Sequence, residues 1–215
     1  MPRTVSPEIQ LDAVSRSLEL IWEDGGVSAT QTLSRRLEAP AQEVWSALTR
    51  PQRLAQWFAP VSGLLRVGGH YAVEDGASGA IIECTAESRL ALTWEFEGAS
   101  SDVVVEVTPD GGGARVHLLH VAVISQEMWT QFGAGAGGVG WDITFRGLQQ
   151  HLEDGVTAPP EPSERIGSEH ARGFTAGSSR RWADASIAAG APAEEARSAA
   201  ERATALYLGE GRSDA

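Results

Sequence analysis

The side chain best suited to chemistry in this sequence is the imidazole of His120. Val116, Leu118 and His120 alternate with residues of the opposite face, which predicts a β-strand whose apolar face carries His120. An inward imidazole can hydrogen-bond a ligand or transfer a proton near neutral pH, and a core histidine bonded to a backbone carbonyl is the alternative. His117 falls on the other face of this strand, so the two rings cannot share a metal.

Other motifs have mainly structural interpretations. The run from Phe132 to Gly140 contains GxGxxG, but dinucleotide binding needs a parallel βαβ unit, and the neighbouring strands are predicted to be antiparallel. We interpret these glycines as a loop that lets the next helix start close to the sheet, or as a mobile gate. Cys84 is expected to be a buried apolar filler, and Glu74 with Asp75 a solvated turn. Neither a metal nor a cofactor is expected.

Composition narrows the class of protein. The 215 residues carry a formal charge of −12, which repels nucleic-acid phosphates and anionic lipid. All 17 basic residues are Arg, which excludes lysine Schiff-base and P-loop chemistry. The single cysteine excludes an intramolecular disulfide, and the N-terminus lacks the apolar core of a signal peptide. No apolar run reaches the roughly 20 residues of a membrane span. We expect a cytoplasmic protein without nucleic-acid binding or membrane insertion.

Two antiparallel hairpins are predicted from period-two patterns. Residues 103–107 and 116–120 alternate on either side of the turn at residues 110–113, whose sequence is Asp-Gly-Gly-Gly. Residues 11–22 and 28–38 flank an Asp-Gly-Gly sequence and are predicted to form a second hairpin, although residues 11–22 also fit a helix.

Two shorter segments, residues 82–84 and 92–96, alternate in the same way. Polar side chains at Glu83, Thr93 and Glu95 mark the solvated face. The side chains expected to point inward are Ile82, Cys84, Trp94 and Phe96.

Helical signals interrupt and follow these strands. Pro40 and Pro51 are each placed to open a short helix, over residues 41–48 and 52–57. Residues 139–152 carry an apolar stripe at helical spacing and predict a long helix that faces the sheet. The predicted fold class is therefore α+β, with a long terminal helix across a curved antiparallel sheet.

The amino-acid composition of the chain changes near Gly155. Beyond it lie a proline-containing stretch without apolar period and two Ala-rich segments divided by Gly190 and Pro192, which predict a linker and a helical hairpin. The hairpin's apolar stripe is too thin to be stable alone, so we expect it to dock on the main domain or on a second subunit of a homodimer. The expected divisions are an N-terminal extension (1–27, a strand or short helix), a main domain (28–155), a linker (156–179), the hairpin (180–209) and a disordered tail (210–215).

Several motifs occur in the order found in a known family. Residues 39–58, from Ala39-Pro40 to Trp57-Phe58, resemble the opening of the START-like helix-grip (SRPBCC) superfamily, in the branch named after the activator of the Hsp90 ATPase. Later motifs similar to that branch are Val67-Gly68-Gly69-His70-Tyr71, Thr93-Trp94-Glu95, Leu118-Leu119-His120 and Gly140-Trp141-Asp142. The resemblance covers roughly residues 28–152 and implies a helix-grip fold, in which a curved antiparallel sheet with two short helices after its first strand wraps around the long helix.

The resemblance also implies a cavity between the long helix and the concave sheet. The expected ligand-binding residues are Trp57 and Phe58 at the rim, together with Tyr71, Trp94, Phe96, Leu118, His120, Trp129, Phe132, Trp141 and Phe145. An apolar cavity with a few polar groups is the usual form of a small-molecule site, and the alternative is that these aromatic side chains simply fill the space.

Three functions are consistent with this resemblance. The leading hypothesis is a non-catalytic protein that binds a small apolar or aromatic molecule. The second is a polyketide cyclase-like or hydrolase-like enzyme, in which His120 is the candidate catalytic residue and Tyr71 or Arg66 its acid–base partner. The third is a module that binds a chaperone and activates its ATPase.

Overall fold

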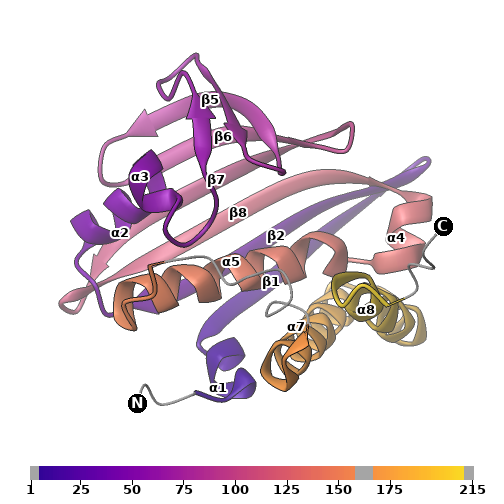
Figure 1. The fold of residues 1–215 in the computed structure, drawn as a ribbon. Coiled ribbons are helices and arrows are strands. Elements are labelled where there is room, and N and C mark those ends of the chain that lie inside the picture. The colour runs from indigo at the N-terminus through magenta and orange to yellow at the C-terminus, as the bar shows by residue number, and fades with distance from the viewer. Residues whose placement is uncertain (1–4, 158–166, 211–215) are drawn as a thin grey trace. The chain divides into compact units, whose positions relative to one another are not determined.

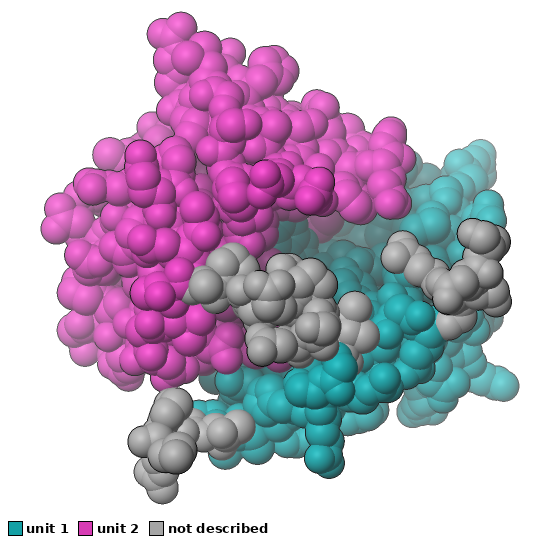
Figure 2. Space-filling model, viewed as in Figure 1, with its two compact units in different colours: residues 1–31, 123–143, 160–215 teal, residues 32–122, 144–159 magenta. Residues whose placement is uncertain are grey.

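A computed structural model gives the structure of the chain and describes residues 5–157 and 167–210. Eight strands form a curved antiparallel sheet in the order β1-β2-β8-β7-β6-β5-β4-β3, and a long helix follows the last strand (Figure 1). This α+β arrangement is the helix-grip fold predicted from the sequence. Two compact units are distinguished in Figure 2: unit 1 comprises residues 1–31, 123–143 and 160–215, and unit 2 comprises residues 32–122 and 144–159.

Unit 2 holds most of the sheet and both short helices. Pro51 is the first residue of its helix, and Pro40 is the N-cap of the other, positions where a missing N–H leaves no helical hydrogen bond unmade. The elements that lie wholly or partly in unit 2 are β2 Gly26–Leu37, α2 Ala41–Thr49, α3 Pro51–Leu54, β3 Val61–Gly63, β4 His70–Val73, β5 Ser78–Thr85, β6 Arg89–Phe96, β7 Ala99–Asp110, β8 Gly113–Ser125 and α5 Gly135–Glu153.

The hairpin of β7 and β8 confirms the prediction from alternation. Its turn at residues 110–113 contains two glycines with φ of 57° and 89°, a conformation that glycine adopts without a Cβ clash. Val103 pairs with His120, and both side chains are buried. His117 is only partly buried, on the opposite face of β8.

Three side chains of β5 and β6 that alternation predicted to point into the core are exposed. A bulge shifts the pairing of the two strands at Ile82, so that Ile81 is buried and Ile82 is 56% exposed. Cys84 is exposed near the end of β5. Phe96 is on the same face as the half-buried Trp94 but is 49% exposed, because it ends its strand beside the hairpin turn. The expectation that Ile82 and Cys84 point inward is therefore wrong, and Phe96 lies on the predicted face without being buried.

The long helix α5 starts earlier than predicted, and its second half belongs to unit 2. There Phe145 and Leu148 are buried. Nε of Arg53, in α3, donates a hydrogen bond of 3.2 Å to Nε2 of His151. These contacts hold the end of α5 against α3.

Unit 1 contains the N-terminal extension and the C-terminal hairpin. Its elements, besides parts of β2, β8 and α5, are α1 Pro7–Asp12, β1 Val14–Glu23, α4 Gln126–Phe132, α7 Glu169–Ala188 and α8 Ala193–Tyr207. Both sequence interpretations of the extension apply, since a short helix precedes a strand that pairs with β2. Within the described ranges, no helix is long and apolar enough to cross a membrane.

The C-terminal hairpin is confirmed, but α7 is longer than predicted. Residues 169–179, expected to be linker, are its first turns, capped by the Ser168 hydroxyl, which accepts from the Ala171 N–H at 3.1 Å. Small residues allow close packing here: a Cβ at Gly177 would lie 2.7 Å from Leu11. The tail beyond Glu210 lies outside the described residues.

Glycines of the predicted loop at residues 132–140 lie largely within α5. A Cβ at Gly138 would overlap the Trp182 ring, and one at Gly135 would lie 2.9 Å from Cβ of Ala203. These glycines therefore serve close packing, as expected. The loop interpretation was wrong, and the close partners are α7 and α8 rather than the sheet.

A buried carboxylate connects β1, α5 and α7. Asp142, 1% exposed, accepts hydrogen bonds from Nε and Nη2 of Arg16 at 3.0 and 2.7 Å. It also accepts from Oγ of Ser178 at 2.6 Å and Nε1 of Trp182 at 3.1 Å. The Asp142 network therefore docks the hairpin onto β1 and α5 of the same chain.

Candidate functional site

The residues predicted to bind a ligand are divided between the two units. Unit 1 holds Trp129, Phe132 and Trp141. The members in unit 2 are Trp57, Phe58, Tyr71, Trp94, Phe96, Leu118, His120 and Phe145. The candidate site is therefore built from the strands of unit 2.

Strands β4, β6, β7 and β8 bring Tyr71, Trp94, Ser101 and His120 together, and we name these four side chains the sheet-face cluster. The rings of Tyr71 and Trp94 lie 6.5 Å apart, and the Tyr71 hydroxyl donates to the carbonyl of Thr93 at 2.7 Å. Ser101 pairs with Trp94 in register and donates to its carbonyl at 3.1 Å. Nε2 of His120 lies 2.9 Å from Oγ of Ser101.

These hydrogen bonds determine the tautomer of His120. The carbonyl of Trp94 can only accept, so the single hydroxyl proton of Ser101 is directed at it. Oγ of Ser101 must then accept from His120, which places the imidazole proton on Nε2 and assigns Nδ1 as the acceptor nitrogen. Ser101 is therefore not arranged as a nucleophile that gives its proton to His120.

Burial keeps the sheet-face cluster uncharged. His120 is 9% exposed, and burial lowers its pKa to about 4, against a smaller opposing effect of the Asp102 carboxylate. Burial, with a further contribution from Glu95, raises the pKa of the Tyr71 hydroxyl above its ordinary value. At neutral pH the cluster offers uncharged hydrogen-bonding groups beside two aromatic rings.

The two expected acid–base partners of His120 have other surroundings or contacts. Arg66 is exposed in the segment between β3 and β4, and the Tyr71 hydroxyl bonds to a backbone carbonyl. Sequence reasoning missed Ser101, whose hydroxyl oxygen lies 2.9 Å from Nε2 of His120. The available signal was its position two residues before Val103 on the alternating strand, which places it on the inward face.

Trp57, expected at the rim of the site, belongs to the core. It is 6% exposed, its Nε1 donates to the Ala47 carbonyl at 3.1 Å, and its ring lies 5.6 Å from that of the half-buried Phe58. Leu118 and Phe145 are also buried. Trp57, Leu118 and Phe145 therefore belong to the hydrophobic core of unit 2.

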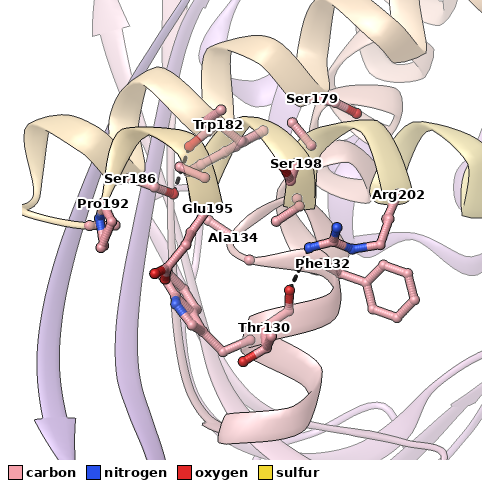
Figure 3. Close-up of a pocket in the computed structure, with 18 of the residues that line it drawn as sticks. Thr130, Phe132, Ala134, Ser179, Trp182, Ser186, Pro192, Glu195, Ser198 and Arg202 are labelled. Carbon is pink, nitrogen blue, oxygen red and sulfur yellow. Dashed lines mark hydrogen bonds between the residues drawn. The ribbon is translucent and has the colours of Figure 1, made fainter.

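The aromatic residues of unit 1 have different surroundings. Trp129 meets Trp22 edge to face, with ring centroids 5.6 Å apart. Trp129 and Phe132 line a pocket closed by α7 and α8 (Figure 3), and Trp141 is buried.

Solved structures similar to this chain share its fold. The crystal structure of CalU16 from Micromonospora echinospora is 32% identical, with a TM-score of 0.55, over 66% of this chain and 87% of CalU16. The solution structure of CalU16 aligns over 92% of this chain and 94% of its own, at 26% identity and a TM-score of 0.61. EF2215 from Enterococcus faecalis, 15% identical, covers 82% of this chain and 93% of its own with a TM-score of 0.58, and shows the fold alone.

The family comparison agrees with the motifs recognised in the sequence. No curated protein matches the chain. The family model described as Activator of Hsp90 ATPase homolog 1-like protein matches residues 38–153, which is more than half of the 215 residues. The chain therefore belongs to the Activator of Hsp90 ATPase homolog 1-like family.

Proposed function

We propose that the chain is a non-catalytic binding protein for a small, largely apolar molecule, held at the sheet-face cluster. The observation that carries this proposal is a neutral imidazole on a predominantly apolar sheet face, beside the half-buried Trp94. Aromatic rings supply contact area, and a few fixed polar groups orient the ligand. The helix-grip fold supports the same function.

The protonation state of His120 favours binding over acid–base catalysis. A general base is most effective when its pKa lies near the working pH, whereas burial lowers the pKa of His120 to about 4. Its Nε2 proton is also engaged with Ser101. The group is therefore suited to a fixed hydrogen-bonding role.

The test is a fluorescence titration with N-phenyl-1-naphthylamine, an uncharged apolar probe. Trp94→Phe and His120→Gln should each weaken probe binding about 5- to 10-fold, as expected for a lost contact worth about 1 kcal/mol. His117→Gln, on the opposite face of the same strand, is the matched control and should bind like the native chain.

Three results would contradict the proposal. One is unchanged probe affinity in both variants despite lowered melting temperatures, which would assign the cluster to packing. A second is saturable turnover of an ester substrate that His120→Gln abolishes, which would favour the enzyme. Stimulation of an Hsp90 ATPase without ligand binding would favour the chaperone-interacting module. Native mass spectrometry of protein from its own host would identify a retained ligand.

A further inference from the structure

A pocket in unit 1 is closed by the C-terminal hairpin (Figure 3). Its volume is about 260 Å³, and it lies between the end of α4, the start of α5 and the facing sides of α7 and α8. Its lining combines the indoles of Trp129 and Trp182 with the small side chains of Ala183, Ala199 and Ala200. Both α7 and α8 lie beyond the residues that match the family model, so family membership does not account for this pocket.

Hydrogen bonds around the pocket fix its walls. Oγ of Ser186 donates to the carbonyl of Trp182 at 2.8 Å. The guanidinium group of Arg202 donates to the carbonyls of residues 130 and 131 at 2.7 Å each, which ties α8 to the end of α4. A pocket with walls held in this way is preformed, and a ligand loses little affinity to reorganisation of the protein.

The size of the pocket selects the class of ligand. An apolar cavity of about 150 Å³ accommodates benzene, and sites for drug-sized ligands begin at about 300 Å³. At about 260 Å³ this pocket fits one substituted aromatic ring. The indoles of Trp129 and Trp182 offer it stacked or edge-to-face contacts.

The polar groups of the pocket favour an uncharged ligand with a hydroxyl group. Ser179 lines the pocket and is 1% exposed, and its Oγ has no hydrogen-bond partner in the part of the chain that the structure describes. A buried hydroxyl without a partner is unfavourable, so a ligand group that pairs with it gains affinity. Glu194 and Glu195 contribute exposed carboxylates to the lining, whereas Arg202 is engaged with backbone carbonyls, so an anionic ligand is disfavoured.

We propose that this pocket binds an uncharged, single-ring aromatic molecule that carries a hydroxyl group. The ring contacts the indoles of Trp129 and Trp182, and the hydroxyl group pairs with Ser179. The C-terminal hairpin is thereby part of a second ligand site. This proposal stands independently of the sheet-face cluster.

The test is an NMR titration of the full chain that follows the indole N–H signals of its seven tryptophans. The probes are p-cresol, its isostere p-xylene, and the anion p-toluate. We expect p-cresol to bind at least about 5-fold more tightly than p-xylene, and p-toluate to bind least, as one satisfied hydroxyl and an unfavourable charge imply.

Variants locate the binding site. Ala183→Leu fills the pocket and should raise the Kd of p-cresol at least about tenfold, whereas Ala188→Leu, exposed on the same helix, should leave it unchanged. Ser198→Leu narrows the partly exposed side of the pocket and gives a second block if Ala183→Leu fails to fold. Ser179→Ala should remove the preference for p-cresol over p-xylene.

Three outcomes would overturn the proposal. They are the absence of p-cresol binding to the native chain, an unchanged Kd in a folded pocket-filling variant, and a p-cresol preference that survives Ser179→Ala. If Ala183→Leu binds p-cresol with native affinity and His120→Gln does not bind it, the probe binds at the sheet-face cluster. This result is one form of the second outcome.

Discussion

The two units bury their polar groups in opposite ways. In unit 1, the buried carboxylate of Asp142 accepts hydrogen bonds from the guanidinium group of Arg16 and from two further donors. In unit 2, burial lowers the pKa of His120 and keeps it neutral, and its Nε2 lies 2.9 Å from the Ser101 hydroxyl oxygen. A paired buried charge allows little rearrangement, because any displaced partner leaves a charge in a medium of low dielectric constant. A neutral imidazole tolerates exchange of its partner, so the comparison assigns a structural role to the Asp142 network and agrees with the binding role proposed for the sheet-face cluster.

Removing the charge of Asp142 is expected to have the largest effect. Asp142→Asn leaves Arg16 buried without its counter-charge, since both side chains are at most 6% exposed, and should destabilise the chain by about 3–5 kcal/mol. Urea unfolding measures the loss. Asp12→Asn removes an exposed partner of Arg181 and should cost about 0–1 kcal/mol. Equal losses in the two variants would contradict a structural role for the Asp142 network.

The pH dependence of stability tests whether His120, in unit 2, is buried in its neutral form. The pKa of His120 is about 4 in the folded chain against 6.5 ordinarily, so between these values the unfolded chain binds a proton that the folded chain does not. Stability must therefore fall as the pH falls from about 6.5 to about 4, by at most about 3 kcal/mol from this group. His120→Gln should reduce this slope in urea unfolding series, and His117→Gln should retain it. An identical slope in His120→Gln would show that His120 is not buried in its neutral form.

Close packing of the hairpin predicts a contrast between two glycines of one helix. Gly138→Ala places a methyl group inside the fully buried Trp182 ring and should destabilise the chain by about 1–3 kcal/mol. Gly147→Ala meets atoms of Trp57 no nearer than 3.4 Å, and it should stabilise α5 by up to about 1 kcal/mol. Thermal unfolding of both variants measures the effect. A stabilised Gly138→Ala chain would show that α7 does not approach α5 closely.

The smallest effect is expected at Cys84. Because its thiol is exposed on β5, Cys84→Ser should change the free energy of unfolding by less than about 0.5 kcal/mol. In the native chain the thiol should react with Ellman's reagent as fast as in urea-unfolded protein. A thiol that reacts only after unfolding would show that Cys84 points inward, as alternation predicted.

Local patterns predicted the fold more completely than the site. Alternation and turn glycines were sufficient for the hairpin of β7 and β8, because both depend on residues close in the sequence. The bulge at Ile82 has no such signal, and one extra residue redirects the side chains of its strand. The start of α7 was missed because its contact face consists of small residues such as Gly177, without an apolar period.

The polar contacts were predicted least well. Arg16 and Asp142 are 126 residues apart, and no local pattern joins them. Ser101 was overlooked because a polar residue that interrupts an apolar alternation suggests that the strand has ended. Its contact with His120 shows instead that it belongs to the inward face. Orientation along a strand follows from the sequence pattern, whereas the identity of a hydrogen-bond partner depends on the register of neighbouring strands.

The Asp142 network can form only after α7 has been synthesised. Its donors enter the growing chain in two stages, first Arg16 and, after Asp142 itself, Ser178 and Trp182 of α7. On the ribosome, residues 32–122 of unit 2 emerge as one continuous stretch, whereas unit 1 is interrupted twice and cannot be completed before α7 is released. Until then, Asp142 lacks half of its donors, and the indole-lined pocket has no α7 wall. Synthesis of α7 therefore completes the charge network and adds a wall to the proposed second ligand site, so the nascent chain cannot bind a ligand there before α7 has emerged.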